Sequence, residues 1–101
     1  MSNVMVRYQV KPERAAENER LVRAVYDELA RAAPDGFRYA TVVLDDGVSF
    51  VHIASITTDD GHNPLRDIKA FGKFQSDVAA RCEQAPSATG FREVGSFRFF
   101  A

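Results

Sequence analysis

Residues 48–57 constrain the fold of this chain more than any other stretch. They are rich in branched and aromatic side chains and are bounded by turn-forming residues, a pattern that predicts a β-strand. Successive side chains of a strand point to opposite faces of the sheet, so Phe50 and Ala54 share one face. Val51 and Ile53 share the other face. Because both faces are apolar, we expect this strand in the middle of a sheet that is covered on both sides.

The rest of the chain divides into alternating strand and helix patterns. Period-two alternation or β-forming composition predicts further strands at residues 4–11, 37–44 and 91–100. Apolar side chains at intervals of three and four predict helices over residues 13–32 and from Asn63-Pro64 to about Glu83, the second one interrupted at Gly72. Residues 85–90 are rich in Pro, Ser and Gly, and we expect them to form a linker.

The hairpin between residues 37–44 and 48–57 sets a register. Asp46-Gly47 is typical of a two-residue turn between antiparallel strands. Counting outward from that turn places Val43 opposite Phe50, Thr41 opposite His52 and Tyr39 opposite Ala54, all on one face. Val42, Ala40, Val51 and Ile53 gather on the other face.

The order strand, helix, strand, strand, helix, strand predicts an α+β fold, a ferredoxin-like βαββαβ sheet of four antiparallel strands. Both helices then cover the same face. Leaving about four apolar side chains of the other face in water would forfeit ~6–12 kcal/mol, at ~1.5–3 kcal/mol each. That loss is comparable with the ~5–15 kcal/mol by which a whole domain is stable. We therefore expect a homodimer in which a second sheet covers this face.

Composition narrows the class of protein. The 101 residues fit one domain, 1–101, and 46% of them are hydrophobic. With 13 Lys and Arg against 14 Asp and Glu, the chain lacks the basic excess of a nucleic-acid-binding protein. No apolar run is long enough to span a membrane, and the first residues lack the pattern of a secretion signal. The single cysteine, Cys82, fits a cytoplasmic protein.

Several short motifs carry a resemblance to a known family. They are Asn63-Pro64-Leu65, Ala70-Phe71, Phe74-Gln75 and the closing stretch 94–100, Val-Gly-Ser-Phe-Arg-Phe-Phe. Together with the order of strands and helices, they make nearly the whole chain resemble the antibiotic biosynthesis monooxygenase family of dimeric α+β barrels. The resemblance implies a homodimer with a ligand cavity between each sheet and its helices.

The family includes cofactor-independent oxygenases of quinols and aromatic polyketides, haem-degrading oxygenases and proteins without a known reaction. The haem-degrading branch uses a haem-ligating His with nearby Asn and Trp, whereas this chain has no Trp and carries Met5 where the Asn would align. No dinucleotide-binding, P-loop or paired-histidine metal motif is present in the sequence. We therefore expect neither a cofactor nor a metal.

His52 is the candidate catalytic residue, because it is the one ionisable side chain of the central strand. A histidine suits the general base that would remove a proton from an activated phenol before oxygen reacts with it. The alternative is a core histidine bonded to Thr41 or to water. The candidate substrate-binding residues form an aromatic pocket around it: Tyr8, Tyr39, Thr41, Phe50, Phe71 and Phe74. Each of the aromatic residues also fits a purely structural role in the core.

Other chemically notable residues have simpler explanations. His62 lies beside two aspartates, but no third ligand at metal-binding spacing accompanies them, so we expect a solvated loop. Arg38, Arg92 and Arg98 are expected on strands, where they either hold an anionic ligand or discourage edge-to-edge aggregation. Cys82 is expected at the end of a helix, as a small buried hydrophobic residue.

Three functions fit these observations. The first is a cofactor-independent monooxygenase acting on a small aromatic or quinol-type compound. The second is a non-catalytic ligand-binding or stress-associated homodimer of the same fold, in which His52 is fully hydrogen-bonded. The third is an isomerase or cyclase on this scaffold, which would consume no oxygen. Whether the chain is an enzyme is left open by the sequence.

Overall fold

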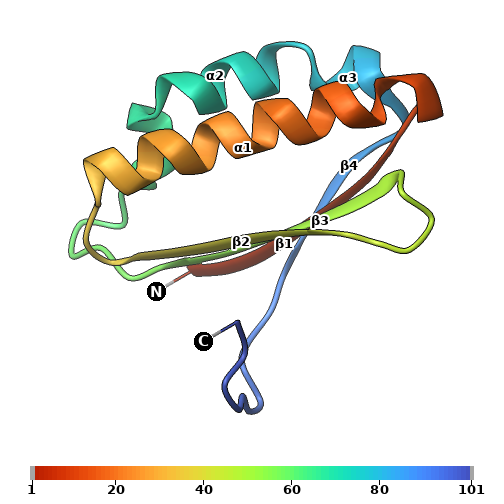
Figure 1. Ribbon diagram of the computed structural model, residues 1–101. Coiled ribbons are helices and arrows are strands. Elements are labelled where there is room, and N and C mark those ends of the chain that lie inside the picture. The colour runs from red at the N-terminus through yellow and green to blue at the C-terminus, as the bar shows by residue number, and fades with distance from the viewer. Residues whose placement is uncertain (1, 101) are drawn as a thin grey trace.

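A four-stranded antiparallel sheet with every helix on one of its faces organises the chain (Figure 1). The computed structural model describes residues 2–100. The strands are β1 (Ser2–Val10), β2 (Phe37–Val43), β3 (Ser49–Ile56) and β4 (Cys82–Gly90). The helices are η1 (Pro12–Arg14), α1 (Ala15–Ala32), η2 (Pro64–Asp67), α2 (Lys69–Ser76) and α3 (Val78–Arg81).

The strand order β2-β3-β1-β4 confirms the predicted ferredoxin-like topology, with β1 and β3 in the middle of the sheet. The register predicted from Asp46-Gly47 is also confirmed, since Thr41 pairs with His52 across β2 and β3. On the other side of β3, Val6 of β1 pairs with the same histidine. His52 therefore occupies the centre of the sheet, flanked by strands on both sides.

Helix α1 lies across the sheet with an apolar stripe turned toward it. Its buried positions are Asn18, Val22 and Val25, spaced by four and three residues. The helix ends at Ala32, and the next residue, Ala33, takes a left-handed conformation and donates its amide to the Leu29 carbonyl. No helix within residues 2–100 is long and apolar enough to cross a membrane.

The second helical region is shorter and more broken than predicted. Asn63 caps its start, since the side-chain oxygen accepts a hydrogen bond from the Leu65 amide at 3.0 Å. The breaks fall at Ile68 and Asp77, whereas Gly72 lies inside α2. Helix continues only to Arg81, because the next residue already pairs with β1.

The predictions for the C-terminal fifth of the chain are wrong. The expected linker 85–90 belongs to edge strand β4, and the expected strand 91–100 is irregular. Strand pairing uses backbone groups, so small and polar side chains do not prevent it, and Pro86 falls where the register shifts at a sheet edge. Val4 already pairs with Gly90, so β1 has almost no residues left to pair with the chain beyond it.

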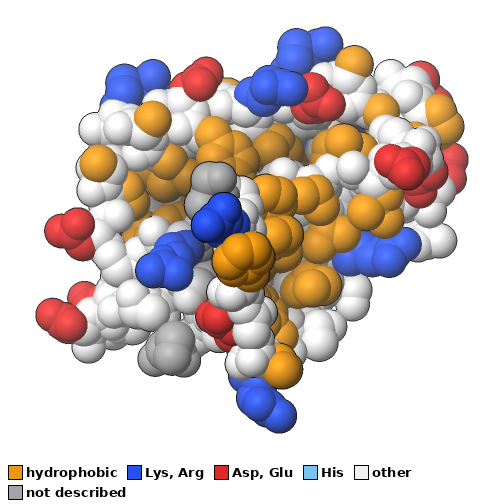
Figure 2. Space-filling view, turned by 60° about the horizontal axis from the view of Figure 1, so that its bottom comes forward, with side chains coloured by type: hydrophobic (Ala, Val, Ile, Leu, Met, Phe, Trp, Pro, Cys, Tyr) orange, Lys and Arg blue, Asp and Glu red, His pale blue; other side chains and the backbone are white. Residues whose placement is uncertain are grey.

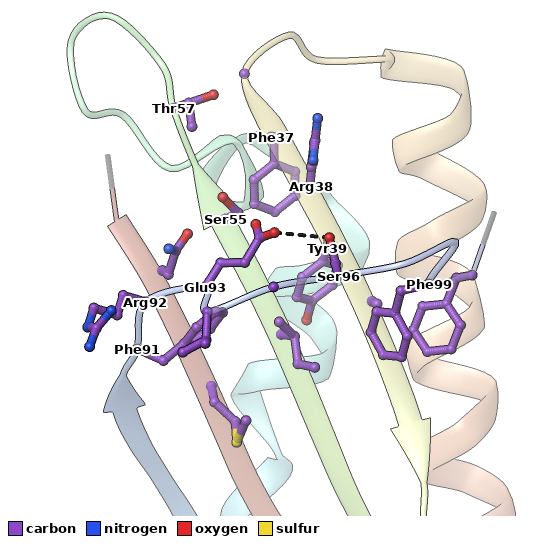
Figure 3. A pocket seen from close by; sticks show the side chains of 18 residues that line it. Phe37, Arg38, Tyr39, Ser55, Thr57, Phe91, Arg92, Glu93, Ser96 and Phe99 are labelled. Carbon is purple, nitrogen blue, oxygen red and sulfur yellow. Dashed lines mark hydrogen bonds between the residues drawn. The ribbon is translucent and has the colours of Figure 1, made fainter.

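The face of the sheet turned away from the helices carries an apolar surface. Figure 2 shows hydrophobic side chains gathered over this face, which includes Met5, Val51 and Ile53. The segment 91–100 crosses it and borders an open hollow of about 1150 Å³ against the sheet (Figure 3). The aromatic side chains of that segment remain mostly in solvent, with Phe97 82% exposed.

Glu28 of α1 ties helix α2 to helix α1. Its two carboxylate oxygens accept hydrogen bonds from the backbone amides of Lys69 and Ala70, both at 3.0 Å. These amides open α2 and have no partner within that helix. The two bonds hold the pKa of the Glu28 carboxyl below its usual range. Glu28 thus anchors the helix that faces the centre of the sheet.

We expect Glu28→Gln to lower the melting temperature at pH 7, because the charged acceptor is lost. Since the folded pKa lies below the ~4.3 of an unfolded glutamate, this stabilisation is complete above that value and disappears as the pH falls through the folded pKa. Thermal unfolding at pH 7 and pH 3 measures the difference. Asp27→Asn, at the exposed neighbouring acid, is the control. Equal effects of the two substitutions would contradict the anchoring role.

Candidate functional site

A cavity of about 380 Å³ lies between the sheet and the second helical region. The strands contribute Val4, Val6, Tyr8, Tyr39, His52, Ala54 and Pro86 to its lining. The helical side contributes Asn63, Leu65, Arg66, Phe71, Phe74, Gln75 and Val78. The volume is within the ~300–1,000 Å³ of small-molecule sites, and such sites are typically apolar with few polar groups. The polar groups deepest in this one surround His52.

Both ring nitrogens of His52 are hydrogen-bonded to hydroxyl groups. Nε2 lies 2.8 Å from the hydroxyl of Tyr8, and Nδ1 lies 2.7 Å from that of Tyr39. Nδ1 is also 3.0 Å from the hydroxyl of Thr41, which in turn lies 2.7 Å from that of Tyr26. The side chain of His52 is only 5% exposed. A ligand in the cavity would therefore exchange protons with the imidazole through the hydroxyl groups around it.

Burial decides the charge state of this cluster. It lowers the pKa of His52 to about 4, because the imidazolium form is poorly solvated between the sheet and the helices. It raises the pKa of Tyr8 and of Tyr39, since their phenolate forms are disfavoured for the same reason. At neutral pH the cavity wall thus presents a neutral imidazole between two neutral phenols.

Aromatic rings surround the polar cluster. Phe74 lies 5.4 Å from the His52 ring and 6.1 Å from that of Tyr8, measured between centroids. Phe71 lies 6.1 Å from Phe74 and extends the apolar wall of the cavity. Phe50 is stacked on Tyr8 at 5.6 Å and lies behind it, outside the cavity lining. The rings make the cavity wall beside the hydroxyl groups largely apolar.

The structure brings together all the residues proposed around His52, but in two layers. Tyr8, Tyr39, Phe71 and Phe74 line the cavity. Thr41 and Phe50 lie in the layer behind it, where Thr41 contacts His52 and Phe50 supports Tyr8.

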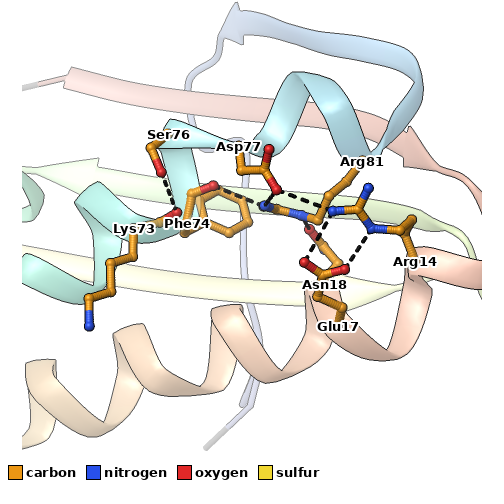
Figure 4. A network of polar contacts seen from close by, with 8 residues as sticks. All are labelled: Arg14, Glu17, Asn18, Lys73, Phe74, Ser76, Asp77 and Arg81. Atoms are coloured by element: carbon orange, nitrogen blue, oxygen red, sulfur yellow. Dashed lines mark hydrogen bonds and ion pairs between the residues drawn. The ribbon is translucent and has the colours of Figure 1, made fainter.

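Sequence reasoning missed two polar residues behind Tyr8, Asn18 and Arg81. Both are fully buried, at 0% exposure. Asn18 donates its side-chain amide to the Tyr8 hydroxyl at 2.9 Å. Arg81 donates Nε to the Asn18 carbonyl at 3.0 Å (Figure 4). Each occupies a core-facing position at helical spacing, four residues before Val22 and seven after Phe74. A polar side chain within an apolar stripe was the signal that could have revealed them.

Other residues singled out from the sequence lie outside this cavity. His62 is in an exposed loop, with Nε2 2.7 Å from the Asp67 carboxylate. Arg38 is exposed on edge strand β2, whereas Arg92 and Arg98 follow the last strand, so their expected strand positions are wrong. Cys82 opens β4 and does not end a helix; it is half-buried, and burial raises the pKa of its thiol.

A pKa of about 4 predicts that His52 stays neutral throughout the physiological range. Because the unfolded value is ~6.5, the unfolded state binds more protons, and folding loses roughly 3 kcal/mol as the pH falls from ~6.5 to about 4. Nuclear magnetic resonance titration of the imidazole measures the pKa directly, with His62→Gln assigning the two histidine signals. A midpoint near 6.5 for His52 would contradict the buried geometry.

Comparison with known proteins finds similarity in structure but not in sequence. No family sequence profile matches the chain, and no curated protein matches its sequence. A crystal structure of an antibiotic biosynthesis monooxygenase superposes with a TM-score of 0.73 at 20% identity, covering 94% of this chain and 100% of that one. Rv0793 from Mycobacterium tuberculosis gives a TM-score of 0.68 at 18% identity, covering 94% and 96% of the two chains.

A third similar structure is SnoaB from Streptomyces nogalater, a cofactor-independent oxygenase, crystallised as an asparagine-to-alanine variant. Its TM-score is 0.67 at 20% identity, with 97% of each chain covered. The alignments extend over nearly the whole of both partners, so the common feature is the complete fold and not a shared fragment. The chain has the α+β fold of the antibiotic biosynthesis monooxygenase structures.

Proposed function

We propose that this chain is a member of the antibiotic biosynthesis monooxygenase family and acts as a cofactor-independent oxygenase on a small aromatic or quinol-type compound. One observation carries the proposal: a neutral histidine lies in the wall of a small aromatic cavity, bonded to two tyrosines that line the same cavity. The shared fold and the oxygenase activity named for SnoaB support it.

Oxygen can be activated without a cofactor when the substrate supplies the electrons. In the simplest balance, the ring CH2 group of an anthrone-type aromatic ketone reacts with O2 to give C=O and water. The O–O bond breaks, one oxygen atom stays on carbon, and the two hydrogens leave in the water. The reaction begins when a proton leaves the substrate and the resulting anion donates an electron to oxygen. The protein must therefore bind a flat ring and accept a proton from it.

The pKa of His52 restricts the substrate. An imidazole whose conjugate acid has a pKa of about 4 is a weak base, so it takes protons efficiently only from an acidic hydroxyl or CH group. Rings that carry a carbonyl beside the reacting group meet this condition, because the carbonyl delocalises the negative charge. Simple phenols do not. The cavity thus favours activated, carbonyl-bearing aromatic compounds.

Oxygen uptake with anthrone-type compounds, and with hydroquinones as less acidic comparison compounds, tests the proposal. We expect His52→Gln to lower kcat/KM by ~10²–10⁴-fold, the usual contribution of a general base. His62→Gln, in the exposed loop, is the matched control and should keep the wild-type rate. The acid limb of the kcat/KM profile should lie near the His52 pKa of about 4, because only the neutral imidazole accepts a proton. A limb near 6.5, or full activity of His52→Gln, would remove His52 from the mechanism.

A non-catalytic ligand-binding protein is the second candidate. The observation in its favour is that both nitrogens of His52 already have partners, as in a structural core histidine. This candidate predicts that aromatic compounds bind in the cavity and quench tyrosine fluorescence, while no oxygen is consumed. An isomerase or cyclase would also leave oxygen untouched but would convert its ligand.

We further propose that two copies form a homodimer through the sheet faces turned away from the helices. Support comes from the apolar side chains of Met5, Val51 and Ile53 on that face and from the exposed aromatic rings of segment 91–100 beside it. A second copy of the same surface would bury both sets at once, in an isologous contact. A sheet that is apolar on both faces is otherwise left with one face in water.

The mass in solution tests this arrangement. We expect a dimer at micromolar concentration by light scattering, and a shift to monomer for Ile53→Lys because a charge would be buried at the centre of the contact. Ala24→Lys, on the exposed side of α1, should leave the dimer intact. Circular dichroism verifies that each variant is folded. A monomeric wild-type protein would refute the proposed contact.

A further inference from the structure

Four side chains form a hydrogen-bonded series from the buried end of α3 to the cavity wall. Arg81 donates to Asn18, Asn18 donates to Tyr8, and the hydroxyl of Tyr8 lies 2.8 Å from Nε2 of His52. All four side chains are at most 5% exposed. Buried polar groups of this kind are normally satisfied by one another, so the donor and acceptor roles along the series are linked.

Arg81 fixes the order of donors and acceptors along the series, because a guanidinium group only donates hydrogen bonds. Its Nε donates to the Asn18 carbonyl at 3.0 Å, and its Nη2 donates to the Phe74 backbone carbonyl at 2.9 Å (Figure 4). The guanidinium carbon also lies 5.1 Å from the centre of the Phe74 ring. These contacts hold the group in place, while the carboxylate of Asp77 stays 3.9 Å from Nη1.

The arginine thereby also fixes which groups donate and which accept between Asn18, Tyr8 and His52. Since the oxygen of the Asn18 side chain faces Arg81, its nitrogen faces Tyr8 and donates at 2.9 Å. The Tyr8 oxygen accepts that bond, so its own hydrogen points to the remaining polar neighbour, Nε2 of His52. If Nε2 carried a hydrogen, two donors would meet the Tyr8 oxygen, and the Tyr8 hydrogen would have no acceptor among the contacts of residues 2–100.

The other side of the imidazole imposes a weaker direction, because Tyr39 is only half-buried and its hydroxyl hydrogen can turn into the cavity when Nδ1 carries a hydrogen. Nδ1 contacts the hydroxyls of Tyr39 and Thr41, and a hydroxyl group can rotate to donate or to accept. Thr41 is in turn bonded to the hydroxyl of Tyr26, where either oxygen can be the donor. The protonation pattern of His52 is therefore decided from the Arg81 side.

We propose that Arg81 and Asn18 are positioning residues that hold neutral His52 as the Nδ1–H tautomer, with the lone pair of Nε2 directed at the hydroxyl of Tyr8. This tautomer makes Tyr8 the proton relay between cavity and imidazole. The ligand proton passes to the Tyr8 oxygen as the Tyr8 hydrogen passes to Nε2. The step leaves a ligand anion, a neutral tyrosine and an imidazolium. The relay rests on the proposed function, whereas the tautomer does not.

Nitrogen-15 chemical shifts of the imidazole ring read the tautomer directly, without substrate. In wild-type protein at pH 7 we expect Nε2 at the position of an unprotonated ring nitrogen and Nδ1 at that of an N–H. Asn18→Asp is nearly isosteric but cannot donate to Tyr8. The Tyr8 hydrogen should then turn to the new carboxylate, and His52 should switch to the Nε2–H tautomer. Asn3→Asp, the same change on the opposite face of the sheet, should leave the spectrum unchanged.

Tyr8→Phe gives a second, independent variant that interrupts the series but keeps the ring. We expect its Nδ1–H population to fall, because nothing then directs the lone pair of Nε2. A wild-type Nε2–H tautomer overturns the proposal, as does an unchanged tautomer in folded Asn18→Asp or in Tyr8→Phe. A protein that holds the Nδ1–H tautomer but consumes no oxygen overturns only the proposed oxygenase function.

Discussion

The structure depends on the burial of strand β3 on the face that points to the helices. Phe50, His52 and Ala54 lie on that face with exposures of 3%, 5% and 5%. Covering them requires α1 and the second helical region to lie on the same side, which the βαββαβ order provides. Glu28 then joins α1 to the second helical region by accepting hydrogen bonds from the first two amides of α2. The cavity is the space left between that helix and the sheet.

A polar cluster in such a core is stable only if its members satisfy one another. Unpaired, each buried hydroxyl or amide would cost ~1–3 kcal/mol. Here Tyr8, Asn18 and the two nitrogens of His52 all have partners. Among the described residues, Nη1 of Arg81 is the one buried side-chain nitrogen without a hydrogen bond, and the Asp77 carboxylate lies 3.9 Å from it. Because Tyr8, Asn18 and His52 are bonded in series, the donor or acceptor role of one group fixes that of the next. A buried arginine at one end can then influence the proton position on a histidine that it does not touch.

The sequence predicts the structure best where residues can be counted outward from a turn. The Asp46-Gly47 turn fixed which residues face each other, so the neighbours Thr41 and Tyr39 of His52 could be predicted from the sequence. Contacts across layers could not be obtained this way. Tyr8 meets Asn18 because β1 lies beneath α1, and Arg81 reaches the pair from α3, 63 residues away from Asn18 along the chain. No spacing rule brings those three positions together.

The sequence alone determined the element order, the register of the hairpin and the two apolar faces of β3, since all three follow from local side-chain pattern and turn chemistry. Only the tertiary structure decided where the last strand lies. Residues 82–90 form β4 because the edge of β1 has unpaired backbone groups. Residues 91–100 leave the sheet because β1 has almost no unpaired residues beyond Val4. Backbone pairing depends on which edge is available, and that is a property of the assembled sheet, absent from any local stretch of sequence.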